Sequence, residues 1–452
     1  MKLKKIYICS KCGAKYPKWQ GQCVECGEWN TLVEDVEEQE TKKAVRKSII
    51  ELSSKKYKLK EIKDESLDKI KTDIEEFDRV ISGGIVKGQT ILIGGVPGIG
   101  KSTLIMEVAA GLSNKGLDVL YISGEESPHQ IAQRAKRLNI DSDRIILASI
   151  TDISEIINQV NELKPDSLIV DSIQTIYHPQ FPSSTASPVQ IRECAMELIK
   201  IAKTKQIPVF ILGQVTKEGD LAGPKLLEHM VDTVLYFEND RYGIYRILRT
   251  FKNRFGAIDE IGIFEMRQEG LISSKTYNQN ILSDDNLAGK TYSATYEGTR
   301  PIIMSVEALV NRSFYPYPKR IFSSIDSNYA QILLASIEKN TPLKFDTYDV
   351  YLNLNSGFKT KDRGIDLAVC SAVISSIKEI PLTNKTAFIG EVGMLGQIYP
   401  ATLIQKRISE LERAGFNKIV LSANTNEKIN STAQIIKLKN ISELYNFIAS
   451  RH

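Results

Sequence analysis

Residues 91–104 read ILIGGVPGIGKSTL, and this stretch decides the fold of the chain. Its inner part, from Gly95 to Ser102, fits the pattern Gly-x-x-x-x-Gly-Lys-Ser, which binds nucleotide phosphates when it lies between a strand and a helix. The apolar run ILIG precedes the pattern, and the helical pattern TLIMEVAAGL follows it. The sequence therefore predicts a P-loop in an α/β domain.

The residue types of this loop suit phosphate chemistry. Its glycines let the backbone turn tightly, so that amide groups and the positive end of the following helix face phosphate oxygens. Lys101 supplies a point charge for the β- and γ-phosphates, and the Ser102 hydroxyl is a ligand for Mg²⁺. We therefore expect ATP and Mg²⁺ as cofactors. The candidate binding residues are Gly95, Val96, Pro97, Gly98, Ile99, Gly100, Lys101, Ser102 and Thr103.

Three further strand ends should border this loop. SLIVDSIQT places Asp171 at the tip of an apolar strand, where ligands bind in open α/β sheets, so we expect Asp171 to share Mg²⁺ with Ser102. YISGEES places Glu125 and Glu126 before a helix that a Ser-Pro pair begins. One glutamate would orient the attacking water; Glu125 is favoured, although the sequence does not separate the two. Gln214, which ends PVFILGQ, is a candidate γ-phosphate sensor or simply a polar strand end.

Four of the six cysteines gather in the first 26 residues, as two Cys-x-x-Cys pairs separated by ten residues. Each pair forms a turn that presents two thiolates to one tetrahedral ion, and four cysteines make a closed structural zinc site. Disulfides are the rival interpretation, which a cytosolic chain disfavours. We expect Zn²⁺ on Cys9, Cys12, Cys23 and Cys26. Cys194 and Cys370 lie in apolar helical stretches and should be inert core residues.

Length and composition limit the class of protein. The 452 residues are enough for about three domains, and 42% apolar with 25% charged residues excludes global disorder. A net charge of +4 is too small to establish a nucleic-acid partner. No apolar run reaches the 18 or so residues of a membrane helix, and the start lacks the apolar region of a secretory signal. We therefore expect a cytoplasmic protein without a membrane partner.

Composition also divides the chain into four regions. Residues 1–33 form the cysteine module, and residues 34–70 are charge-dense, as in a linker with some helical tendency. In residues 71–285, apolar runs alternate with helical stretches, which predicts parallel strands buried between helices. These runs are TILIGGV, DVLYIS, SLIVDSI, PVFILGQV, DTVLYF and YRILRTF. Residues 286–452 form a second α/β region, with TYDVYLNLN, TAFIGEVG and helices around DLAVCSAVISSIKE and KRISELERAG.

A basic and aromatic strip could bind a polymer. Residues 241–256 read RYGIYRILRTFKNRFG, with five cations and no acid. Cations that pair with phosphates, beside rings that stack on bases, are typical of single-strand binding. The core positions should be Ile244, Ile247 and Leu248. The segment singled out is Lys252, Asn253, Arg254, Phe255 and Gly256, with a solvated hairpin end as the alternative. Two loops at strand ends, 178–190 and 216–229, would couple nucleotide binding to polymer binding.

Together, these motifs resemble the RadA (Sms) family of bacterial DNA repair proteins, essentially from end to end. The resemblance rests on YPKWQGQCVECGEWNTL, LIGGVPGIGKSTL, YISGEES, IVDSIQT, GQVTKEGDLAGPKLLEHMVD, RTFKNRFG and IGEVGMLGQIYP. It implies an α/β protein with three parts: a RecA-like P-loop ATPase core with a parallel sheet, the small Cys₄ zinc module, and a C-terminal α/β domain like that of Lon protease.

The resemblance also implies a function. Family members are DNA-dependent ATPases that process recombination intermediates and promote branch migration beside the RecA recombinase. Single-stranded and branched DNA would be the partners, and the family forms helicase-like hexameric rings with nucleotide between subunits. In such a ring Lys252 or Arg254 is the candidate finger that acts in trans on a neighbour's nucleotide; DNA contact is the alternative role.

The C-terminal region departs from an active Lon-type protease. In KDRGIDLA, Asp366 stands where a nucleophilic serine would be, and Gln405 stands where the partner lysine would be, with Lys406 one place off. Ser356 and Ser371 are nearby but outside the motif. A missing nucleophile removes the covalent route, so we expect an inactive domain that supports assembly and DNA binding.

Three classes of function are compared. A motor that couples ATP hydrolysis to movement on DNA is favoured, with Lys101, Glu125, Asp171, Gln214, Lys252 and Arg254 as candidate catalytic residues. A nucleotide-switched, DNA-binding scaffold is the main alternative, and Asp366 and Gln405 disfavour an ATP-dependent protease. The zinc module would bind either DNA or a protein.

Overall fold

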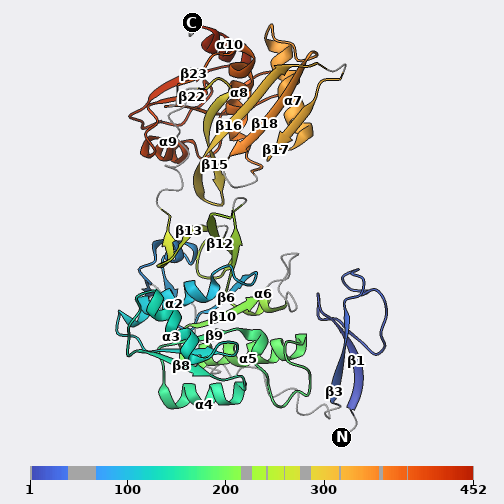
Figure 1. Ribbon diagram of the computed structural model, residues 1–452, viewed down its shortest axis with the longest axis vertical. Helices are drawn as coiled ribbons and strands as arrows, with labels where there is room; N and C mark the ends of the chain where they lie inside the picture. Colours follow the sequence, from blue (N-terminus) through green and yellow to red (C-terminus); the bar gives the residue numbers. More distant parts are fainter. Residues whose placement is uncertain are drawn as a thin grey trace, which may run out of the picture. The chain divides into compact units, whose positions relative to one another are not determined.

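The computed structural model describes residues 3–38, 68–214, 226–240, 243–258, 260–274, 287–314, 317–355, 360–383 and 385–450. The chain divides into two compact units, residues 1–274 and 275–452 (Figure 1). Most of the predicted linker, Ser356 and most of the loop 216–229 lie outside the described residues. Among the residues that are described, no helix is both long and apolar enough to cross a membrane.

The N-terminal module is a three-stranded antiparallel sheet in the order β2-β1-β3. Its strands are β1 (Leu3–Cys9), β2 (Lys15–Tyr16) and β3 (Leu32–Glu38), so β3 runs into residues that composition alone assigned to the linker. The buried apolar cluster of the module consists of Cys9, Cys23 and Leu32, with Tyr7, Ala14 and Tyr16 packed against it. A core of this size does not fold on hydrophobic burial alone, which agrees with a module built around a metal.

The first unit also contains a nine-stranded sheet in the order β14-β13-β12-β11-β6-β10-β9-β7-β8. Strands β6 to β11 pair in parallel, as the apolar runs predict. The strands are β6 (Thr90–Gly95), β7 (Val119–Ser123), β8 (Ile145–Ser149), β9 (Ser167–Asp171), β10 (Val209–Gln214), β11 (Thr233–Asn239), β12 (Tyr245–Asn253), β13 (Ile261–Arg267) and β14 (Gly270–Ser273).

Two predictions for this part of the chain were wrong, one for the YRILRTF run and one for Ile244, which precedes it. This run forms β12, which pairs antiparallel with β11 rather than parallel. The connection from β11 to β12 is too short for the crossover that a parallel pair needs, so the chain turns back on itself. Ile247 and Leu248 are buried as expected, whereas Ile244 is 58% exposed, because it lies in the connection before β12 begins at Tyr245.

Helices cover both faces of the nine-stranded sheet (Figure 1). Successive residues of β6 point to opposite faces, so Leu92 packs with α4 and α5 while Ile91 and Ile93 pack with α1, α2 and α3. The helices of this part are α1 (Glu75–Val80), α2 (Lys101–Ser113), α3 (Pro128–Arg137), α4 (Ile153–Leu163), the 3₁₀ helix η2 (Ile173–Thr175), α5 (Pro188–Lys205) and α6 (Leu226–Met230). A small antiparallel pair joins β4 (Lys69–Ile70) to β5 (Ile85–Val86).

The second unit is built on a seven-stranded mixed sheet in the order β17-β18-β16-β15-β19-β22-β23. Helices α7, α8 and α10 pack on one face, and α9 packs on the other. The strands are β15 (Lys290–Glu297), β16 (Arg300–Arg312), β17 (Arg320–Ser323), β18 (Tyr348–Asn355), β19 (Thr386–Ile389), β22 (Lys418–Ser422) and β23 (Gln434–Leu438), with a separate pair, β20 (Glu391–Val392) and β21 (Ile398–Tyr399). The helices are α7 (Ser327–Asn340), the 3₁₀ helix η3 (Arg363–Ile365), α8 (Asp366–Lys378), α9 (Ile404–Arg413) and α10 (Ile441–Ala449).

An ion pair joins α9 to the start of η3. Arg407, on α9, is 1% exposed, and its Nη1 lies 2.6 Å from Oδ2 of Asp362, which caps η3. Its Nε donates to the carbonyl of Thr402, and its guanidinium lies 4.7 Å from the ring centre of Tyr296. Burial alone would raise the pKa of Asp362, but the hydrogen bonds from Arg407 bring it below its usual value.

Candidate active site and zinc centre

The P-loop follows β6, whose neighbours in the sheet are β10 and β11. Gly98 and Gly100 have φ angles of 76° and 113°, which side chains other than glycine rarely adopt. Gly100 is also the residue before α2, so the left-handed turn leads directly into the helix. The loop therefore has the backbone shape and the helix N-terminus that phosphate binding needs.

Lys101 lies folded over this loop. Its Nζ donates to the carbonyl oxygens of Gly95 at 2.8 Å and Val96 at 3.1 Å, and the side chain is largely buried. Burial lowers the pKa of Lys101, while the nearby charges of Asp171 and Glu125 partly offset that effect. The ammonium is thus held at the mouth of the loop, beside two carboxylates of the candidate site.

Asp171 forms a compact group with two hydroxyls. Oδ2 accepts a hydrogen bond of 2.8 Å from Tyr121 on β7, and the Ser102 hydroxyl on α2 is near enough to lower the pKa of this carboxyl. Burial raises the pKa of Asp171, and these two hydroxyls oppose that rise. A serine hydroxyl directly beside an aspartate is the donor set by which P-loop ATPases hold Mg²⁺. The residues present therefore fit ATP with Mg²⁺, and the ion would neutralise charge on the phosphates.

The two glutamates after β7 have different partners. Oε1 of Glu125 accepts from the Ser172 hydroxyl at 2.6 Å and from Nε2 of Gln214 at 3.2 Å. Oε1 of Glu126 instead lies 2.5 Å from Nη2 of Arg134 on α3. Glu125 is therefore the glutamate that joins the ends of the strands that carry Asp171 and Gln214.

Three members of this group were missed from sequence. Tyr121 lies within an apolar strand, where the pattern predicts a core residue. Ser172 directly follows Asp171, and Arg134 lies eight residues beyond its partner Glu126. A polar residue next to a predicted metal ligand was the one available signal, and it pointed to Ser172. The start of α3 was predicted correctly, since Ser127 caps it and Pro128 is its first residue.

The KNRFG segment and the P-loop lie at opposite ends of the central strands of the sheet. Strand β11 pairs Phe237 with Gly95 at the P-loop end and Thr233 with Ile91 at the other end. Thr233 is also the partner of Asn253 on β12. Four residues along a strand correspond to about 13 Å, and Arg254 lies beyond Asn253. The KNRFG segment therefore lies away from the P-loop of its own subunit.

Within this segment, the residues differ in how firmly they are held. Lys252 donates to three carbonyls at the end of α6 (Glu228, His229 and Val231). Asn253 is buried and bonds to Ser82, Thr233 and the amide of Phe255. A Cβ on Gly256 would lie 2.1 Å from Oγ of Ser82, so that position excludes larger residues. Arg254 has a side chain that is 56% exposed and lies 3.5 Å from Asp232.

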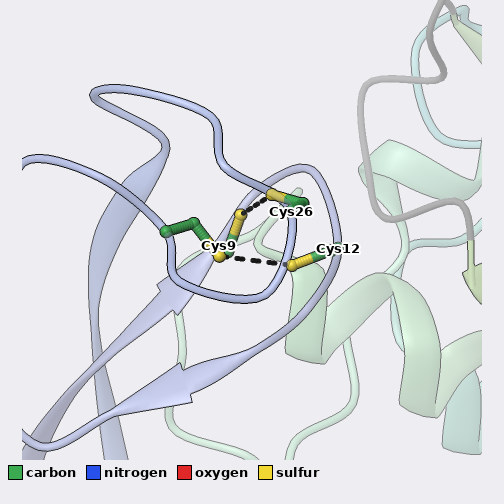
Figure 2. Close-up of side chains that lie close together, drawn as sticks. Cys9, Cys12 and Cys26 are labelled. Atoms are coloured by element: carbon green, nitrogen blue, oxygen red, sulfur yellow. Dashed lines mark hydrogen bonds between the residues drawn. The ribbon is translucent and has the colours of Figure 1, made fainter.

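The four N-terminal cysteines converge from two turns, and Figure 2 shows Cys9, Cys12 and Cys26 meeting at one point. All four Sγ atoms lie within 4.8 Å of one another. The Cys9–Cys26 and Cys12–Cys23 sulfurs are 3.7 Å and 3.5 Å apart, close to the roughly 3.8 Å that tetrahedral zinc with 2.3 Å bonds requires. The donor set therefore fits Zn²⁺, as the sequence predicts.

Neighbouring hydroxyls support these sulfurs. Cys9 lies 3.3 Å from Oγ1 of Thr31, and Cys23 lies 3.3 Å from the hydroxyl of Tyr16. Gly13 and Gly27 follow the second cysteine of each pair with φ angles of 75° and 74°, and each amide bonds back to the first cysteine of its pair. Such contacts orient metal ligands and tune their charge.

Those of the residues compared with a protease site that the structure describes are held in other contacts. Asp366 is fully buried at the start of α8, where Oδ2 accepts from Tyr329 and from the amide of Val392. Gln405, on α9, donates to the carbonyl of Asn430. Ser371 is buried, and its hydroxyl donates to Leu367 of its own helix. Cys194 and Cys370 are buried, as predicted.

Three family models match the chain. An ATPase model described as KaiC matches residues 70–157. A rubredoxin metal-binding domain matches residues 7–34, and a model described as subunit ChlI of Mg-chelatase matches residues 328–425. These matches and the architecture confirm the predicted fold class and the cofactors ATP, Mg²⁺ and Zn²⁺.

A solved structure and several curated proteins are also similar. The structure of a KaiC-like protein from Pyrococcus horikoshii matches with a TM-score of 0.40 and 18% identity, over 46% of this chain and 99% of that one. "DNA repair protein RadA" of Bacillus subtilis is 43% identical over 93% of both chains. The protein of the same name from Streptococcus pyogenes serotype M1 is 42% identical over 99% of this chain and 100% of its own. With this similarity over nearly its whole length, the chain belongs to the RadA family of DNA repair proteins.

Proposed function

We propose that this protein is a DNA-stimulated ATPase that works as a ring-shaped motor in recombinational repair. One observation supports the motor proposal. In the register of β6, β11 and β12, the P-loop and KNRFG lie at opposite ends of the strands of one sheet. The register keeps Arg254 of a subunit away from that subunit's own P-loop, so an Arg254 that acts on ATP would act on the nucleotide of a neighbour. Closed rings present one heterologous surface to the next subunit, which allows this arrangement.

The nucleotide half of the site supports hydrolysis. Lys101 would hold the phosphates, Ser102 and Asp171 would hold the ion that neutralises phosphate charge, and Glu125 would orient the attacking water. Gln214 bonds to Glu125 at the end of β10, immediately before a segment with the sequence VTKEGDLAGPK. Gln214 therefore links the catalytic group to that segment, through which DNA binding would change the rate of hydrolysis.

The substrates we propose are single-stranded and branched DNA, with branch migration beside the RecA recombinase as the outcome and a hexamer as the working assembly. The cytoplasm, where the chromosome lies, would be the place of action. We propose a zinc module, a linker, an ATPase domain and a C-terminal domain as the four parts of the chain, with β3 extending the zinc module to Glu38. The C-terminal domain would support assembly and DNA binding rather than peptide cleavage, since Asp366 is buried and Ser371 is bonded within its own helix.

Unwinding and hydrolysis assays test this proposal together. ATP turnover should rise when single-stranded DNA is added, and forked or three-stranded DNA should be resolved with ATP by the wild type but not by the Lys101→Ala variant. DNA-stimulated turnover without any strand displacement would instead identify a nucleotide-switched scaffold. Degradation of casein that requires ATP would identify a protease.

A further inference from the structure

Arg134 forms an ion pair with one of the two adjacent glutamates that follow β7. Helix α3 is fixed at its start by a capping box, in which the side chains of Ser127 and Gln130 bond to each other's backbone amides. The helix places the guanidinium of Arg134 against Glu126, with Nη2 2.5 Å from Oε1. The amide of Glu126 also donates to Oγ of Ser123 at 3.0 Å. Glu126 is thus held through both its backbone and its side chain.

Glu125, the preceding residue, is held in a different way. Its carboxylate accepts from Ser172 and Gln214, which end two other strands of the sheet. The charges that raise the pKa of Lys101 against the effect of burial are Asp171 and Glu125. The two neighbouring carboxylates therefore have separate partners. The charge of Glu125 raises the pKa of Lys101, whereas Glu126 forms an ion pair with Arg134 of α3.

The guanidinium of Arg134 is largely buried, and part of it has no hydrogen-bond partner in the part of the chain that the structure describes. Its side chain is 18% exposed, and Nη1 is buried without a hydrogen-bond partner among the described residues. Burial would lower the pKa of Arg134, but the bond to Glu126 and the charge of Asp171 raise it. A permanently charged guanidinium is therefore retained inside the site, although Glu126 takes up only part of its hydrogen-bonding capacity.

We propose that Arg134 is a positioning residue for ATP hydrolysis, which holds Glu126 aside so that Glu125 is the single glutamate facing the attacking water. Without this cation, the unpaired charge of Glu126 would lie beside Glu125 and Asp171 and repel both. Glu126 would also compete with Glu125 for the polar partners at the strand ends. The proposal rests on the proposed role of Glu125 and adds a residue that its own sequence motif does not reveal.

Substitutions of Arg134 and Glu126 test the idea, with ATP turnover and ATP affinity measured separately. Arg134→Gln should lower kcat about tenfold or more, with KM and the Kd for ATP within about twofold of wild type. Arg134→Lys should recover part of kcat, because the charge returns. The double variant Glu126→Gln with Arg134→Gln should turn over faster than Arg134→Gln alone, because no unpaired carboxylate remains. Arg137→Gln, on the exposed side of the same helix, is the matched control and should leave kcat unchanged.

The failures of the two proposals are distinguishable. If Glu125→Gln keeps near-normal turnover, the assigned role of Glu125 is wrong, whatever Arg134 does. If Glu125→Gln is inactive but Arg134→Gln turns over normally, only the role of Arg134 is wrong. If the losses in the double variant simply add and ATP affinity falls with them, Arg134 only stabilises the fold, and the positioning role is also overturned.

Discussion

The ammonium of Lys252 donates a hydrogen bond of 2.7 Å to the carbonyl oxygen of Val231. It also binds the carbonyls of Glu228 and His229 at 2.8 Å and 3.0 Å, so all three of its donors are used within its own subunit. Arg254, two residues further on, has a side chain that is 56% exposed. Of the two cations of KNRFG, we therefore expect Arg254 to act on the neighbouring subunit and Lys252 to stabilise the end of α6.

Mixed rings test this division of roles. Arg254→Ala subunits and Lys101→Ala subunits should each be nearly inactive alone. When they are combined, some sites have an intact P-loop facing an intact Arg254, so ATP hydrolysis should partly return. The measurement is steady-state phosphate release as a function of the mixing ratio.

The matched mixture uses Lys252→Ala in place of Arg254→Ala. Because Lys252 bonds within its own subunit, its loss should not be repaired by a neighbour, and this mixture should stay nearly inactive. Recovery with Lys252→Ala but not with Arg254→Ala would reverse the assignment. If rings form and neither mixture recovers, KNRFG does not act in trans, and DNA contact becomes its role.

Lys101→Ala should lower ATP turnover by two or more orders of magnitude. The ammonium that the carbonyls of Gly95 and Val96 hold over the P-loop would be lost, and charge developing on the phosphates would be less compensated. Circular dichroism should show an unchanged fold. Turnover close to that of the wild type would contradict the assignment of this loop.

The N-terminal module should carry about one Zn²⁺ per chain and depend on it for folding. Cys9→Ser should remove the ion and unfold this module, because its apolar cluster is too small to fold alone. ATP turnover without DNA should survive, since the P-loop belongs to a separate sheet. Elemental analysis of protein purified without chelator is the measurement, and absence of zinc in the wild type would contradict the prediction.

Arg407→Met should destabilise the C-terminal unit by about 3 kcal/mol, because it leaves the carboxylate of Asp362, whose side chain is only 16% exposed, without its cation. Replacing both partners with apolar residues should cost less than replacing Arg407 alone, because no uncompensated charge is then buried. Chemical denaturation of the wild type, the two single variants and the double variant measures the difference. A double variant less stable than the sum of both single losses would show that hydrogen bonds other than the ion pair dominate.

Asp366 should make the stability of the C-terminal unit depend on pH. Burial raises the pKa of Asp366 from 3.8 to about 7, against the opposing effect of its bond from Tyr329. A folded pKa above the unfolded value stabilises the fold at pH below about 4, and this contribution is lost as the pH rises through about 7. Up to about 4 kcal/mol is involved. Asp366→Asn should flatten the dependence between pH 4 and pH 7 in thermal unfolding, and an unchanged slope would contradict the raised pKa.

Local pattern was enough to predict the parts whose chemistry is local. The P-loop is one continuous segment between a strand and a helix, and the zinc site is two Cys-x-x-Cys turns with glycines after them. The capped start of α3 at Ser127 follows from the same kind of signal. In each case the residues that decide the structure lie within a few positions of one another, so side-chain chemistry and backbone preference act together.

The contacts between distant residues depend on strand order and register, which the local pattern does not contain. Only the alignment of β7, β9 and β10 shows that Glu125 meets Ser172 and Gln214, while Glu126 turns to Arg134. Only the antiparallel pairing of β11 with β12 places KNRFG at the end of the strands opposite the P-loop. A sequence pattern reports which face of a strand is apolar, but the free energy that selects its neighbours comes from packing across the whole sheet. The sequence thus determined which chemical groups this protein has, and the tertiary structure decided which of them act on one another.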